Sequence, residues 1–168
     1  MQKSTQKTKN FITLFFLSIT AALFFFCIFI YLSYAYIKPF NPTFDTTLGG
    51  QIVYNIQTER IGGSHVSISG VAFNPDASTG IFNSHFILKD TRDGSFYRLF
   101  TQMIKHPDVP EEWLTNYGDN PIIYRNNGMK AVINVNKLTS PLNYYTIFIL
   151  YENDGLFEFI DTGIRLPD

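Results

Sequence analysis

The residues best suited to bind a ligand gather in one long irregular stretch that is rich in Pro, Gly, Asn and Asp. It contains three aromatic residues, Trp113, Tyr117 and Tyr124, together with the polar residues Asn116 and Asp119. Aromatic faces beside amides and carboxylates suit sugar rings, which stack on one side and form hydrogen bonds around the edge. We predict that these five residues form a ligand- or partner-binding surface. The alternative is that Trp113 and Leu114 plug one open end of the fold.

Residues for covalent catalysis or metal binding are harder to find. A nucleophile needs a neighbouring base, but the single cysteine, Cys27, lies in an apolar run, and no Gly-x-Ser-x-Gly motif occurs. His65 and His85 occupy alternate positions of expected strands and should face solvent. The histidines show no metal-binding spacing. We therefore expect no enzymatic activity, no cofactor and no metal.

One different function remains open as the alternative, an enzyme that acts on envelope glycans. Glycoside hydrolysis uses two carboxyl groups about 5 to 10 Å apart across a cleft. The irregular stretch holds the clustered acids that such chemistry would need, Asp108, Glu111, Glu112 and Asp119.

The charge distribution argues against a nucleic-acid partner. The chain has 13 basic and 14 acidic residues, and residues 1–37 hold three of the basic ones, Lys3, Lys7 and Lys9, and no acid. The remainder has 10 basic and 14 acidic residues, so its net charge is 10 − 14 = −4. Nucleic-acid-binding domains usually carry a basic patch or stripe. We expect no nucleic-acid partner.

A long apolar run near the N-terminus predicts a membrane-spanning helix. No charged residue occurs between Lys9 and Lys38, and the segment 11–30 is almost wholly apolar. A helix rises about 1.5 Å per residue, so this segment matches a hydrocarbon core of roughly 30 Å. The lysines before the run, with Lys38 alone close behind it, predict a cytoplasmic N-terminus and an extracytoplasmic C-terminal part.

The predicted organisation has four parts. They are a cytoplasmic basic tail (1–10), a transmembrane anchor (11–37), a stalk (38–48) and an extracytoplasmic domain (49–168). The alternative to a retained anchor is a signal peptide cleaved after Ala35. Apolar regions of signal peptides are about 7 to 15 residues long. The longer run found here favours retention.

Beyond the stalk, the hydrophobic pattern has the period of strands. Apolar residues alternate with polar ones, and turn sequences such as Asp90–Gly94 and Asn153–Gly155 separate the alternating segments. The expected strands contain residues 52–56, 66–69, 86–88, 96–101, 129–135, 145–151 and 156–160, with a short extended piece near 164–166. This pattern predicts an antiparallel β-sandwich of seven or eight strands.

Three stretches have recognisable local patterns. They are residues 67–73 (SISGVAF), residues 86–109, which end in a Pro-Asp-Val corner, and residues 127–147, which read as a Gly-to-Tyr hairpin. Together they resemble an extracytoplasmic Ig-like β-sandwich domain of Gram-positive bacterial cell-envelope proteins. Gly70 would permit a bulge, and Val71 stands where that family prefers Trp. The resemblance implies an all-β fold, an antiparallel Ig-like β-sandwich preceded by one N-terminal transmembrane helix. It carries over no catalytic residue.

These observations lead to one functional prediction. We expect a single-pass cell-membrane protein whose non-enzymatic extracytoplasmic domain serves as an interaction or accessory module of the cell envelope. Its expected partners are the membrane itself and either an envelope polysaccharide or another membrane protein.

Overall fold

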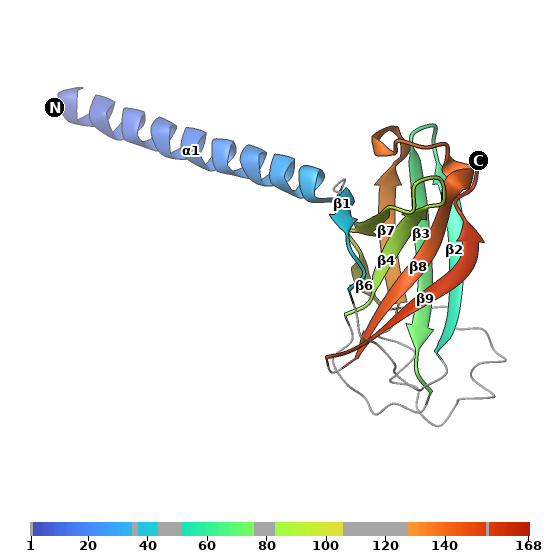
Figure 1. Ribbon diagram of the computed structural model, residues 1–168. Helices are drawn as coiled ribbons and strands as arrows, with labels where there is room; N and C mark the ends of the chain where they lie inside the picture. The colour runs from blue at the N-terminus through green and yellow to red at the C-terminus, as the bar shows by residue number, and fades with distance from the viewer. Residues whose placement is uncertain (1, 35–36, 44–51, 76–82, 106–127, 154) are drawn as a thin grey trace. The chain divides into compact units, whose positions relative to one another are not determined.

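The computed structural model describes residues 2–34, 37–43, 52–75, 83–105, 128–153 and 155–168 (Figure 1). These residues form two units, a helical one up to residue 35 and a β unit from residue 36 to the end. Each unit is described by itself below.

The first unit is a single helix, α1 (Gln2–Tyr34). Its segment Ile12–Ile30 has a mean hydropathy of 2.5 and is long enough to cross a membrane. Side chains along this segment are exposed. Ser18 and Thr20 donate their hydroxyls to the backbone carbonyls of Phe15 and Phe16, so neither hydroxyl needs water as a partner.

The second unit consists of two antiparallel sheets, which appear as two layers in Figure 1. The five-stranded sheet has the order β1-β5-β4-β8-β9, and the four-stranded sheet has the order β2-β3-β7-β6. The strands are β1 (Ile37–Phe40), β2 (Val53–Ile61), β3 (His65–Phe73), β4 (His85–Asp90), β5 (Phe96–Leu99), β6 (Gln102–Ile104), β7 (Gly128–Asn134), β8 (Tyr145–Asn153) and β9 (Leu156–Arg165). Two short 3-10 helices, η1 (Val135–Lys137) and η2 (Leu142–Tyr144), connect β7 to β8.

One hydrophobic core joins the two sheets. Every second residue of the central strands points into it, as period-two alternation requires. The four-stranded sheet contributes Val66, Ile68, Met129, Ala131 and Ile133, and the five-stranded sheet contributes Phe86, Leu88, Leu99, Tyr145, Ile147, Ile149 and Tyr151. The expected antiparallel β architecture with one N-terminal apolar helix is thereby confirmed.

The details of the strands differ from expectation in three places. β1 starts one residue before the expected stalk and takes residues 38–40 into the sheet, where Pro39 is tolerated because β1 is an edge strand. The three-residue β6 also falls outside the expected strands. β9 runs on through a register shift opposite Thr146 and Phe148, where Gly163 adopts a φ of 67° and interrupts the alternation.

Gly70 is required by the close approach of two strands, and the expected bulge is absent. Its register with Ile56 on one side and Met129 on the other runs through the described ladder without a shift. A Cβ placed on Gly70 would lie 2.3 Å from the carbonyl oxygen of Asn55 and 3.1 Å from the Cα of Ile56. Backbone atoms cannot move aside as a flexible side chain can, so the strand ladder itself excludes a side chain at this position.

We predict that Gly70→Ala destabilises the β unit by about 1–3 kcal/mol, the usual cost of overpacking. The measurement is the free energy of unfolding of the full chain in detergent, obtained by denaturant titration. Gly63→Ala is the matched control, because a Cβ at Gly63 meets no atom within 4 Å. Equal stability of the two variants would contradict the close approach.

Candidate functional site

The predicted binding residues lie outside the described part of the chain. This applies to Trp113, Asn116, Tyr117, Asp119 and Tyr124. It applies equally to the acids of the alternative enzymatic reading, Asp108, Glu111 and Glu112. Both expectations therefore remain predictions, and the candidate site is built from other residues, which belong to the described ranges.

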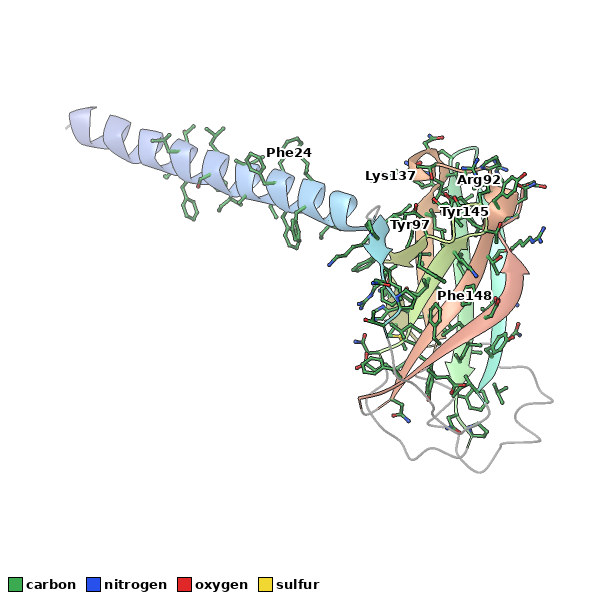
Figure 2. All side chains as sticks on the ribbon, in the orientation of Figure 1. Phe24, Arg92, Tyr97, Lys137, Tyr145 and Phe148 are labelled. Atoms are coloured by element: carbon green, nitrogen blue, oxygen red, sulfur yellow. The ribbon has the colours of Figure 1, made fainter. Side chains whose placement is uncertain are left out.

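That surface is the outer face of the five-stranded sheet, the face turned away from the shared core. An antiparallel sheet with one face on a core usually presents polar residues on the other. Here Ile87, Phe148 and Leu150 point outward, yet they are 0%, 6% and 3% exposed. Figure 2 labels Phe148 part of the way along β8. β8 is therefore buried on both of its faces.

Aromatic rings from neighbouring strands cover these three residues. Phe148 and Phe159 stack with centroids 5.0 Å apart and planes inclined by 19°. Phe96 meets both rings edge-on, at 5.7 Å from Phe148 and 5.6 Å from Phe159. We call the whole group the outer aromatic cluster: Phe40, Ile87, Phe96, Phe148, Leu150, Phe157 and Phe159.

The contacts within the cluster show that the sheet is strongly curled. Phe40 belongs to β1 and Phe159 to β9, which are the opposite edges of the five-stranded sheet. Their ring centroids nevertheless lie 6.3 Å apart. Such a contact requires the outer face to be concave, so that rings from both edges meet above the central strands. Four rings, those of Phe40, Phe96, Phe157 and Phe159, stay partly exposed and form the surface of the cluster.

The outer face of the four-stranded sheet is polar along only part of β3, because Val71 and Phe73 also alternate with core residues on that face and are 1% and 0% exposed. Ser67 and Ser69 alternate with core residues along β3, and Ser69 is flanked by Gln57 on β2 and Lys130 on β7. The five-stranded sheet is the one whose outer face carries the outer aromatic cluster. This cluster makes the outer face of the five-stranded sheet the candidate site, since rings held on rigid strands can contact a partner at little entropic cost.

Basic side chains border the outer aromatic cluster. The ammonium nitrogen of Lys89 lies 5.5 Å from the centroid of Phe96 and 5.7 Å from that of Phe148, within the range of cation–π attraction. Arg98 donates a guanidinium N–H to Nε2 of His85. The site thus combines apolar rings with positive charge.

His85 points outward as expected, but it is partly buried rather than solvated. Because its Nε2 accepts from Arg98, the proton of the neutral ring sits on Nδ1, a buried atom with no hydrogen-bond partner in the described ranges. Burial, and then the charge of Arg98, lower the pKa of His85 from 6.5 to about 4. The imidazole is therefore neutral at physiological pH and adds no charge to the site.

This lowered pKa predicts that the domain loses stability as the pH falls from about 6.5 to about 4. In that window the unfolded chain binds a proton at this residue and the folded chain does not, so protonation favours unfolding. We expect a loss of about 1–3 kcal/mol, reduced from the full linkage value because the ring is partly exposed. Urea titrations of the full chain across this pH range measure it.

His85→Gln should flatten the pH dependence in this window, because glutamine keeps an acceptor for Arg98 but does not titrate. His65→Gln, the same replacement on β3, is the matched control. An unchanged pH profile in the His85 variant would refute the assignment of this loss of stability to His85.

A second polar cluster, centred on Asp90, serves to join two connections of the fold. Asp90 is 1% exposed and accepts hydrogen bonds from the backbone N–H of Arg92, at 2.9 Å, and from the hydroxyl of Ser140. Ser140 in turn donates its backbone N–H to the Tyr145 hydroxyl at 3.1 Å. Figure 2 shows Arg92 and Tyr145 at the same end of the domain.

Burial alone would raise the pKa of Asp90. The hydrogen bonds from Ser140 and Arg92 and the positive charge of Arg92 outweigh that effect, so its pKa lies below the usual value and the carboxylate stays ionised. The Ser140 hydroxyl donates to this carboxylate rather than to an imidazole. The arrangement therefore ties the β4–β5 turn to the β7–β8 connection.

The described residues offer a surface for non-covalent binding. Among them, no three His, Cys, Asp or Glu side chains lie close enough together to hold a metal ion.

The sequence signal for the aromatic face is the run Tyr145–Tyr151, which is apolar at six of its seven positions. A strand with one solvent-exposed face has a polar residue at every second position. A strand buried on both faces has a nearly continuous apolar run instead, as found here.

Comparison with known proteins gives no further guide to the site. The chain matches no family model, no curated protein and no solved structure.

Proposed function

We propose that this chain is a single-pass membrane protein with an extracytoplasmic, Ig-like β-sandwich that acts as a non-enzymatic interaction or accessory module of the cell envelope. In this proposal α1 anchors the protein, with the lysine-bearing N-terminus in the cytoplasm. The outer aromatic cluster contacts an envelope polysaccharide or a neighbouring membrane protein.

The observation that carries the proposal is the aromatic outer face on a domain that follows a membrane-length helix. Exposed apolar surface on a soluble domain commonly marks an interaction site. Phe40, Phe96, Phe157 and Phe159 supply partly exposed apolar surface on strands, which hold it more rigidly than a loop would. Aromatic residues are also enriched at the centres of binding interfaces.

The orientation of the protein gives the first test of this proposal. We expect a C-terminal alkaline phosphatase fusion, which is active only outside the cytoplasm, to show activity. A C-terminal fusion to a fluorescent protein that matures only in the cytoplasm should stay dark. The reverse pattern would overturn both the location and the proposed function.

Intact-mass analysis of the membrane-extracted protein distinguishes a retained anchor from a cleaved signal peptide. A mass of the whole chain supports the anchor. A mass starting at Tyr36 would indicate cleavage after Ala35 and a released domain, since β1 begins at Ile37 and would be left intact.

The second test concerns the binding surface. We expect Phe159→Ala to reduce the polysaccharide or membrane protein recovered with the chain from native membranes by roughly tenfold, because hot-spot aromatics contribute about 1–2 kcal/mol or more. Gln57→Ala, which changes an exposed polar residue beside Ser69 on the outer face of the four-stranded sheet, is the control and should leave recovery unchanged. Thermal unfolding of each variant shows whether the domain is still folded.

Tyr117→Ala and Tyr124→Ala extend this test to the surface predicted from the sequence. Loss of recovery in these two variants alone would place the partner on the irregular stretch and not on the aromatic face. Unchanged recovery in all three aromatic variants would refute an aromatic contact of either kind.

A further inference from the structure

We propose that Lys38, Lys89 and Arg98 form a binding site for anionic phospholipid headgroups of the membrane that α1 crosses. We call these three residues the basic edge. The inference rests on the proposed anchoring and goes beyond it, because it assigns a ligand to residues outside the aromatic rings.

The three side chains come from adjacent strands and share the outer face. On β1, Ile37 packs against the shared core and Phe40 against the outer aromatic cluster, so alternation turns Lys38 outward. On β5, Leu99 lies in the core and Phe96 in the cluster, so Arg98 also points outward. Lys38 and Arg98 are direct cross-strand partners.

The positive charges of the basic edge have no counterion in the described part of the domain. Like charges directly opposite each other destabilise a strand pair. No carboxylate of the described ranges lies within ion-pair distance of these three residues. The salt bridge found among the described residues joins Arg92 to Asp90, at 3.8 Å. His85, the hydrogen-bond partner of Arg98, is neutral because of its lowered pKa. An external anion would relieve this repulsion.

The acids of the same face lie on β8 and β9. Asp161 is on the edge strand β9, opposite Phe148, and accepts the backbone N–H of Gly163 at 2.9 Å. Glu152 is near the end of β8, opposite Phe157. The β1–β5–β4 half of the face is therefore positive, although the chain beyond its three N-terminal lysines has a net charge of 10 − 14 = −4.

Chain length favours lipid over other anions. Two residues separate the last residue of α1, Tyr34, from the first residue of β1, Ile37. An extended chain spans at most about 3.6 Å per residue, so β1 starts within roughly 11 Å of the end of α1. In a protein anchored by α1, Lys38 is thus held near the headgroups by covalent linkage alone. Phe40, two residues further and on the same face, adds an apolar ring suited to the interface.

The test uses the full chain in nanodiscs of phosphatidylcholine, with or without phosphatidylglycerol, and measures the acylation rate of each lysine by mass spectrometry. A bound anionic headgroup stabilises the ammonium form and slows the reaction. We expect Lys38 and Lys89 to react roughly fivefold more slowly in the anionic discs, an effect equivalent to a typical membrane-surface attraction, and the difference to shrink in high salt. Lys130, on the other outer face, should react equally in both discs.

Lys38→Gln should reduce the lipid-dependent protection of Lys89, whereas Lys130→Gln, its matched control, should not. Equal rates of Lys38 and Lys89 in the two discs would overturn the lipid site and leave the proposed function standing. Protection that appears only after envelope polysaccharide is added to phosphatidylcholine discs would reassign the basic edge to an anionic glycan. That result would also overturn the lipid site. Failure of the chain to incorporate into discs would overturn the anchor and, with it, both proposals.

Discussion

The burial of β8 on both faces is the constraint on which the rest of the domain depends. Its inward residues, Ile147 among them, complete the core shared with the four-stranded sheet, while Phe148 and Leu150 need a separate cover on the other side. The described elements supply no further layer for that purpose. The five-stranded sheet instead curls and brings aromatic rings from both of its edges over β8. The edge strands β1 and β9 are therefore needed for packing as well as for hydrogen bonding.

The Asp90 cluster solves a different problem, the positioning of two connections at one end of the domain. Thr91 donates both its backbone N–H and its hydroxyl to the carbonyl of Tyr144, each at 2.9 Å, and the Arg92 guanidinium lies 5.5 Å from the centre of the Tyr144 ring. A buried carboxylate is tolerated only when its oxygens are satisfied, and removal of one partner leaves an uncompensated charge. The ionised Asp90 thus specifies one arrangement of these loops.

The sequence was sufficient for the class of fold, because hydrophobic periodicity and turn residues are local signals. The turns at Gly94 and Gly155 adopt the positive φ values that their sequences suggest. Long-range contacts could not be predicted in the same way. Nothing local to Phe40 and Phe159 shows that these rings meet, and the pairing of Pro39 with Tyr97 joins residues that are far apart in the chain. The lowered pKa of His85 likewise depends on its burial in the folded domain and then on Arg98, which is contributed by another strand.

The place of β1 in the sheet has a mechanical consequence. β1 is the part of the β unit nearest to α1 along the chain, and it is held to the sheet by a four-residue ladder with β5 and by the packing of Ile37 and Phe40. A pull on the domain against a fixed α1 would pass first through this ladder. If β1 detached, the next strand along the chain would be β2, in the other sheet, and the outer aromatic cluster would lose one of its rings. Tension at the anchor and the integrity of the aromatic face are therefore coupled through four residues.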